Sequence, residues 1–445
     1  MQKNTAIYYI LFIVLLKLLF ALFLPLNFDE IQMLNILSSN SWDNISHHLI
    51  MNDTQLPFYY YIIHKLHQIG VTDPTFLRIF NWLLGLSIIP ICFQIEKENI
   101  QKNKYFFTTL CLSTYYSIIH TTIIRPYIFL FIFGLILVKY FLKKEDQNKL
   151  GDWFFLSLSL ILCAQTHYFG LYLAILFILF YPLKTKVSAT RISISVFLAI
   201  AFFLIFQSSF QTISYDIVNI PIHRHNPNFI EAVNRFIYII GGTEFILYTL
   251  IICLFYFQKN LRIDFDFNRI KSMSLFIGLF FSIPLFVSYN LTPCLETRFF
   301  ACIIPFNYYV LINFIPELRN KKLYIAFYLF LLFSISRSIY NLDSDFYFNF
   351  RKAEKFISNI YQNNSNSKLF LTLKVCPKDI YFKNYNSKCV HQYSKKDTDF
   401  FHKYTSSNRP AILITDSQNL KIPSNAKRIF KQKSIRIYTF NIKSD

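Results

Sequence analysis

Long apolar runs recur along most of the chain and are separated by short polar segments. Most runs hold about 17–22 residues, and a helix of that length crosses the hydrocarbon layer of a bilayer, which is roughly 30 Å thick. The pattern predicts an all-α polytopic membrane protein with about eleven membrane-spanning helices, at residues 6–26, 76–95, 105–123, 126–142, 152–166, 168–183, 192–210, 236–257, 272–290, 299–315 and 323–340.

The pattern changes after residue 341. The stretch "DFYFNFRKAEKFISNIY", residues 345–361, has a helical period, whereas "KLFLTLKV", "PAILITD" and "RIYTFNI" read as strands. The sequence therefore predicts two domains: a transmembrane body at 1–340 and a small α/β domain at 341–445.

The segment between the first two apolar runs, residues 27–75, is long enough to hold structure of its own. Its stretch "NDTQLPFYYYIIHKLHQIG", residues 52–70, is aromatic and amphipathic, and its end is too polar to cross a bilayer. It is predicted to lie along the membrane interface as a juxtamembrane helix.

Composition agrees with a membrane protein. Hydrophobic residues make up 54% of the 445 residues and charged residues 16%, although the formal net charge is +20. Much of this charge falls in short loops beside the apolar runs, so nucleic acid is a poor candidate partner, and membrane lipids are the expected surroundings. The first apolar run lacks a good cleavage site and is interpreted as a signal anchor.

The loop charges also predict the orientation. With a cytoplasmic N-terminus, the inner loops hold 17 Lys and Arg and the short outer loops hold five. That difference follows the positive-inside rule. The loop at 27–75 and the C-terminal domain are therefore expected outside the cytoplasm, in a multi-pass protein of a bacterial inner membrane.

Two adjacent carboxylates, Asp29 and Glu30, follow the first run in "NFDE". One interpretation is structural, because Asn27 is a good helix cap and acidic residues favour the first turn of a helix. The other is functional, because Arg125, His167 and Arg298 are all predicted at outer turns. Together, these side chains predict a polar cavity at the outer leaflet.

Such a cavity suits the transfer of a sugar from a polyprenyl phosphate. One base takes the proton of the acceptor hydroxyl, and cations hold the phosphate as it leaves. A glycoside hydrolase would instead place two carboxylates across the bond. Adjacent helical residues point about 100° apart, so Asp29 and Glu30 suit one base with one helper.

Several motifs resemble the GT-C glycosyltransferases of the protein mannosyltransferase and aminoarabinose transferase type, including the bacterial PMT_2-like enzymes. They occur in the family's order: "FDE" after the first run, "LPFYYYIIHKLHQIGVTDPTFLRIFNWLLG" (56–85), "RPY" (125–127), "THYFG" (166–170) and "ETRFFACIIP" (296–305). The resemblance implies a GT-C fold, an inverting transferase and a polyprenyl-phosphate sugar donor. It implies Asp29 as the base. We predict in addition a substrate-binding set of Tyr59, Arg125, Tyr127, His167 and Arg298.

Other hypotheses remain open at this point. A transporter or flippase of lipid-linked sugars, a glycan polymerase or ligase, and a noncatalytic scaffold all suit a polytopic chain. The acceptor is a lipid, a glycan or a protein, no cofactor is certain, and a divalent metal is optional. Cys376 and Cys389, thirteen residues apart in the predicted outer domain, are expected to form a disulfide in an oxidising compartment.

Overall fold

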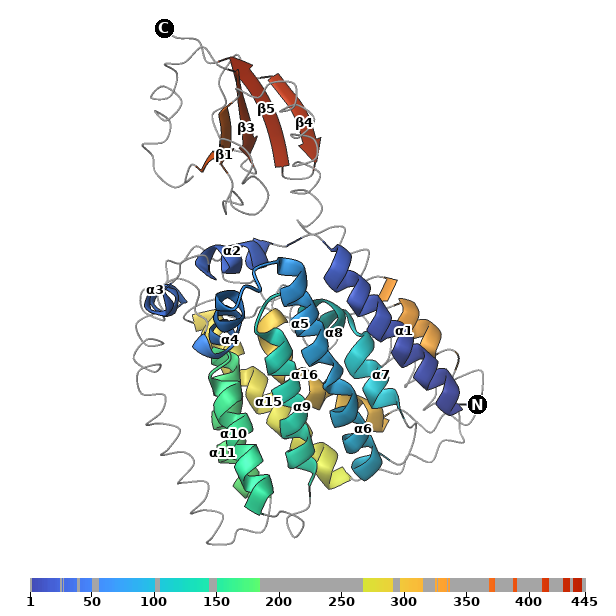
Figure 1. Cartoon of the computed structure of the whole chain (residues 1–445). Helices are drawn as coiled ribbons and strands as arrows, with labels where there is room; N and C mark the ends of the chain where they lie inside the picture. Colours follow the sequence, from blue (N-terminus) through green and yellow to red (C-terminus); the bar gives the residue numbers. More distant parts are fainter. Residues whose placement is uncertain are drawn as a thin grey trace. The chain divides into compact units, whose positions relative to one another are not determined.

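The computed structural model describes two units of the chain (Figure 1). The first comprises residues 1–22 and 39–338, and the second comprises 23–38 and 339–445. The described residues are 2–24, 26, 28–37, 41–49, 56–100, 105–143, 150–184, 267–290, 297–314, most of 325–336, and five strands between 368 and 441.

The described part of the first unit is helical. Its elements are α1 (Gln2–Phe23), α3 (Trp42–His48), α4 (Pro57–Gln68), α5 (Pro74–Leu86), α6 (Ile88–Asn99), α7 (Phe106–Ser113), α8 (Tyr115–His120), α9 (Tyr127–Leu142), α10 (Leu150–Ala164), α11 (Tyr168–Lys184), α15 (Phe267–Asn290), the 3-10 helix η3 (Thr297–Cys302) and α16 (Ile304–Phe314). Helix α9 lies in the core, because almost all its side chains are buried and it packs against α6, α10, α16 and η3.

Among the described residues, three helical segments are long and apolar enough to cross a membrane: Asn4–Phe23, Pro74–Asn99 and Ile270–Val287. Shorter apolar helices cover Tyr127–Leu142, Gly151–Ala164, Tyr168–Tyr181 and Phe300–Asn313. These helices support a membrane protein, and each falls on a predicted span. The spans predicted at 192–210 and 236–257 lie outside the described residues.

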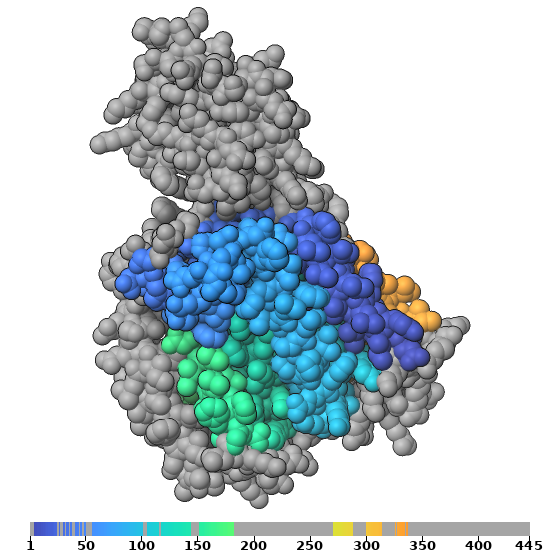
Figure 2. Space-filling model, in the orientation of Figure 1, coloured from blue at the N-terminus to red at the C-terminus, as the bar shows by residue number. Residues whose placement is uncertain are grey.

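Helix α1 lies on the surface of its unit (Figure 2). One side of α1 is buried, while its large apolar side chains on the other side are exposed: Tyr8, Leu11, Phe12, Leu15, Leu19, Leu22 and Phe23. An apolar stripe of this size is uncommon on a water-facing surface. It is the arrangement expected of a helix that faces lipid.

The span predicted at 105–123 is not one continuous helix. Thr114 has an extended backbone, with φ −72° and ψ 153°, and separates α7 from α8. Its hydroxyl accepts from the Tyr308 hydroxyl at 2.6 Å and from the Ser117 amide at 3.5 Å. A threonine hydroxyl that caps a new helix competes with continuation of the preceding helix. The hydropathy pattern around Thr114 does not show that its partner is Tyr308 on α16.

Two glycines allow backbone segments to approach closely. A Cβ atom at Gly134, within α9, would clash with the backbone carbonyl of Cys302 in η3. A Cβ atom at Gly170, in the first turn of α11, would clash with the carbonyl of Cys163. These contacts hold η3 against α9, and the first turn of α11 against the end of α10.

The second unit contains α2 (Phe28–Leu37) and a five-stranded sheet in the order β2-β1-β3-β5-β4. Strand β1 (Lys368–Thr372) is parallel to β2 (Ser387–Cys389) and β3 (Pro410–Thr415), whereas β5 (Ile435–Asn441) is antiparallel to β3 and β4 (Lys427–Gln432). The predicted strands coincide with β1, β3 and β5, and the alternation did not reveal β2 or β4.

Two predictions for this unit concern residues that the structure does not describe. The helix predicted at 345–361 lies outside the described residues, so an α/β domain stays a prediction. Cys376 also lies outside them, while Cys389 is the last residue of β2. The proposed disulfide between these two cysteines therefore stays a prediction too.

Candidate functional site

Helix α4 places two adjacent tyrosines in the core of the first unit. Pro57 is its first residue, a position that needs no amide donor. The Phe58 amide donates to the Gln165 carbonyl at 3.1 Å, which ties the start of α4 to the turn before α11. Tyr59 and Tyr60 are fully buried. Two motifs about 100 residues apart in the sequence thus meet at one end of the helical unit.

Tyr59 belongs to a buried hydrogen-bonded group that includes α5. Its hydroxyl oxygen lies 2.9 Å from Nδ2 and 3.1 Å from Oδ1 of Asn81, a residue with no exposed surface. Asn81 Nδ2 also donates to the Ile123 carbonyl at 2.5 Å. This amide therefore joins α4 and α5 to the turn that precedes Arg125.

Arg125 is held by the neighbouring tyrosine. Its Nη1 donates to the Tyr60 hydroxyl at 2.5 Å, and its side chain is buried. Its own amide donates to the Ile123 carbonyl at 2.8 Å, and Pro126 then caps α9. A guanidinium fixed in this way presents a planar set of donors, which is the geometry that grips a phosphate.

Tyr127 and His167 continue the polar group next to Arg125. Tyr127 is the first residue of α9 and is buried, with ring-centroid distances of 5.3 Å to His120 and 6.3 Å to His167. His167 Nδ1 accepts from the Phe169 amide at 3.1 Å, so in the neutral ring the proton is on Nε2. The hydrogen bond fixes the imidazole plane at the start of α11.

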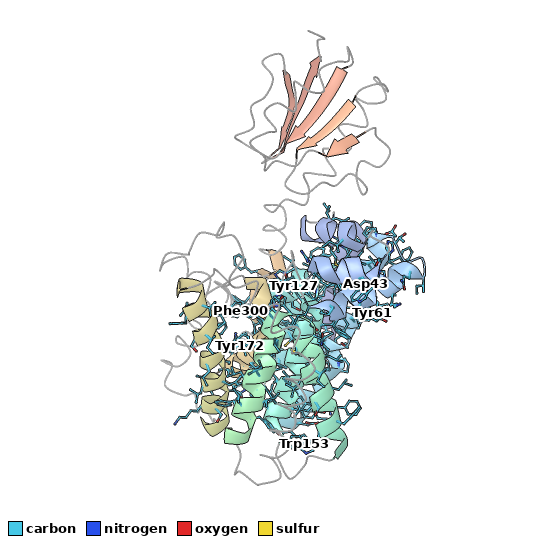
Figure 3. The ribbon with its side chains drawn as sticks, turned by 90° about the vertical axis from the view of Figure 1, so that its left-hand side faces the viewer. Asp43, Tyr61, Tyr127, Trp153, Tyr172 and Phe300 are labelled. Atoms are coloured by element: carbon cyan, nitrogen blue, oxygen red, sulfur yellow. The ribbon has the colours of Figure 1, made fainter. Side chains whose placement is uncertain are left out.

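Arg298 belongs to η3, which packs against α8, α9, α11 and α16. The Phe300 ring lies 4.8 Å from the Phe169 ring, centroid to centroid, and Tyr127 and Phe300 lie at the same end of the helical unit, away from Trp153 (Figure 3). The side chain of Arg298 lies outside the described part of the structure. The structure thus brings together Tyr59, Arg125, Tyr127 and His167, with the backbone of η3 beside α9 and α11.

The two carboxylates lie in the second unit. Asp29 and Glu30 are the second and third residues of α2, so the helix predicted after "NF" is present. Glu30 is fully buried, whereas the side chain of Asp29 and the capping residue Asn27 lie outside the described residues. Acidic residues at these positions favour the helix N-terminus, and a structural role therefore stays compatible with the backbone.

The sequence analysis did not identify three residues of this region. Arg78 and Asn81 are buried on α5, inside a predicted span, and His120 packs on Tyr127. Polar residues within apolar spans are a functional signal in themselves. That signal could have identified Arg78 and Asn81 without a structure.

The middle of α4 carries a buried histidine. His64 Nε2 accepts from Gln68 Nε2 at 3.0 Å, and its ring lies 5.7 Å from the Trp42 ring. Burial lowers the pKa of His64 below its usual value, and the neighbouring Lys65 and His67 lower it further. The imidazole is thus held in its neutral form, in which Nδ1 carries the proton.

In the described part of the chain, His, Cys, Asp and Glu do not form a group of three or more that could hold a metal ion. The first unit offers instead a buried arginine, Arg125, whose guanidinium is bonded to Tyr60, while Tyr127, close by in the sequence, packs near His120 and His167. This set can hold an anion through hydrogen bonds, and its described residues include no carboxylate base.

Comparisons with known structures identify the fold. The crystal structure of ArnT from Cupriavidus metallidurans bound to undecaprenyl phosphate matches with a TM-score of 0.58 at 10% sequence identity, over 99% of each chain. The apo structure of the same protein matches with a TM-score of 0.58 at 11% identity, over 100% of each chain. The chain has the fold of ArnT.

This likeness confirms the GT-C fold that the sequence motifs predicted. The likeness to ArnT extends over the full length of both chains. Sequence comparison by itself does not reveal it, since no protein-family model matches the sequence. No curated protein matches it either.

Proposed function

We propose that this protein is an integral-membrane, inverting glycosyltransferase. It takes a sugar from a polyprenyl-phosphate carrier at the outer leaflet and transfers it to a lipid, glycan or protein acceptor. The observation that carries the proposal is the full-length likeness to ArnT, a protein crystallised with undecaprenyl phosphate. The buried Arg125, fixed by Tyr60, supplies a phosphate-binding group at one end of the helical unit.

The proposed reaction needs one base and a stabilised leaving group. The acceptor oxygen forms a bond to the anomeric carbon, the bond from that carbon to the phosphate oxygen breaks, and the acceptor proton goes to Asp29. Arg125 and Arg298 hold the phosphate, which leaves with the bond's electron pair as the polyprenyl phosphate. Glu30 supports the base or a cation, His167 orients a neighbouring group, and Tyr59 and Tyr127 contribute to the substrate site.

A divalent metal stays optional in this scheme. Two arginines already supply the charge that a metal would supply to the phosphate. In the proposed topology the protein is a multi-pass protein of a bacterial inner membrane, with α2 and the sheet outside the cytoplasm. A predicted disulfide between Cys376 and Cys389 belongs to the same topology, because it needs an oxidising compartment.

A second candidate is a flippase for lipid-linked sugars. The observation in its favour is the break between α7 and α8 at Thr114, since transporters often place their sites at interrupted helices. Purified protein in liposomes with a radiolabelled polyprenyl-phosphate sugar separates the two functions. Transfer of the label to an acceptor fraction supports the glycosyltransferase. Movement of the carrier between leaflets without transfer supports the flippase and contradicts the enzyme.

A further inference from the structure

A lysine within the first apolar helix is buried in the helical unit. Lys17 lies on α1, yet only 5% of it is exposed, while large apolar side chains of the same helix face outward. A lysine within an apolar span is costly to bury and normally has a specific partner.

Lys17 binds α8 through two hydroxyls. Its Nζ donates to Ser117 Oγ at 2.9 Å and to Thr121 Oγ1 at 3.2 Å. These acceptors are four residues apart, so they lie on one face of the helix. Both bonds form whether the side chain is an ammonium or an amine, because either form has at least two N–H donors.

Helix α8 has only six residues, and it depends on contacts with its neighbours for its position. At its start, Thr114 is bonded to Tyr308 of α16. Near its end, Lys17 holds Ser117 and Thr121. The turn at 121–126 follows directly, and it carries Arg125 at the point where the chain enters α9.

We infer that Lys17 is a positioning residue for Arg125, and this inference rests on the proposed function. Lys17 fixes α8 from the lipid-facing side of the unit, and α8 fixes the 121–126 turn. Tyr60 and Asn81 hold the same turn from α4 and α5. Arg125 therefore receives its orientation from three helices, one of which is the membrane helix α1.

Undecaprenyl phosphate serves as the probe, and its dissociation constant is measured on purified full-length protein in nanodiscs. Lys17→Met keeps the length of the side chain and removes its donors, and we expect about 3- to 30-fold weaker binding, as for residues that act on a site through intermediate contacts. Lys17→Arg restores the donors, and binding should return to within about 3-fold of the wild-type value. Lys139→Met is the control, because Lys139 lies in the last turn of α9, at the opposite end of that helix from Arg125.

A double-mutant cycle separates positioning from a general loss of stability. In the Arg125→Ala background, Lys17→Met should weaken binding no further, because the group it positions is absent. Additive losses in the double variant, or unchanged binding in Lys17→Met, would overturn the inference. If Lys17→Met does not fold, the Ser117→Ala/Thr121→Val variant removes the acceptors instead and should show the same pattern.

The same measurements separate this inference from the proposed function. If the wild-type protein does not bind undecaprenyl phosphate, the proposed function fails and the role of Lys17 fails with it. If the wild-type protein binds and Arg125→Ala does not, while Lys17→Met binds normally, only the inference about Lys17 fails.

Discussion

Arg125 Nη1 donates to the Tyr60 hydroxyl at 2.5 Å, and both side chains are buried. The two residues are 65 positions apart, yet this bond fixes the arginine that the proposed mechanism places on the donor phosphate. The orientation of the guanidinium is thus set in advance of substrate binding, as electrostatic stabilisation of a leaving group requires.

Tyr60→Phe removes this acceptor while preserving the ring. Hydrogen bonds to charged groups contribute about 1.5–3 kcal/mol, so we expect a comparable loss of folding free energy. The KM for a polyprenyl-phosphate sugar should rise more than kcat falls. Tyr61→Phe is the control, because Tyr61 is 45% exposed on the same helix. Equal kinetics in both variants would contradict the role of Tyr60.

Asn81→Leu is expected to destabilise the protein strongly. The variant removes the hydrogen bonds from Asn81 to the Tyr59 hydroxyl and to the Ile123 carbonyl, and each buried hydrogen bond contributes about 0.5–1.5 kcal/mol. The midpoint of thermal unfolding, measured in detergent, should fall by several degrees. Asn99→Ala provides the comparison, since Asn99 is only partly buried and its Nδ2 bonds the Ile95 carbonyl of its own helix. A similar midpoint for both variants would argue against the buried group.

Gly134→Ala tests the close approach of α9 and η3. The new methyl group would meet the Cys302 carbonyl, so η3 must shift, and strain of this kind typically costs about 1–3 kcal/mol. Gly151→Ala is the matched control, because no described residue lies within 4 Å of a Cβ atom there. Alanine stabilises a helix relative to glycine by about 0.5–1 kcal/mol. The two substitutions should thus shift the unfolding midpoint in opposite directions.

The lowered pKa of His64 predicts that the folded protein loses stability at acidic pH. Its pKa is lowered in the folded protein, so below the ordinary histidine value of about 6.5 the unfolded chain binds more protons. This residue should therefore cost stability progressively as the pH falls through 6.5 toward the lowered pKa. In His64→Gln, the unfolding midpoint should change less between pH 7.5 and 5.5 than in the wild type. An unchanged pH dependence would exclude His64 as its source.

Asp29→Asn tests the proposed base. The substitution preserves the shape and removes the proton acceptor, so transfer should fall by about 10²–10⁴-fold while the protein stays folded. Glu30→Gln should have a milder effect, because Glu30 acts only as a helper. Near-normal transfer by Asp29→Asn in a radiolabelled donor assay would return Asp29 to a role at the N-terminus of α2.

The sequence by itself determined the elements whose signals are local. The apolar runs predicted α1, α9, α10, α11 and α15, because most residues of a membrane-spanning helix meet lipid or an apolar neighbour. Alternation predicted β1, β3 and β5 for the same local reason. The motifs around Arg125, Tyr127 and His167 were also found, since each stands where an apolar run begins or ends, and Tyr59 was found in the amphipathic stretch at 52–70.

Only the tertiary structure decided how these motifs are held. The break at Thr114 depends on Tyr308, which is 194 residues away in the sequence, and the role of Lys17 depends on hydroxyls about 100 residues away. Asn81 has a similar dependence on Tyr59 and Ile123. Hydrophobic periodicity reports whether a side chain faces an apolar environment, but it carries no information on which distant polar atom completes a buried hydrogen bond.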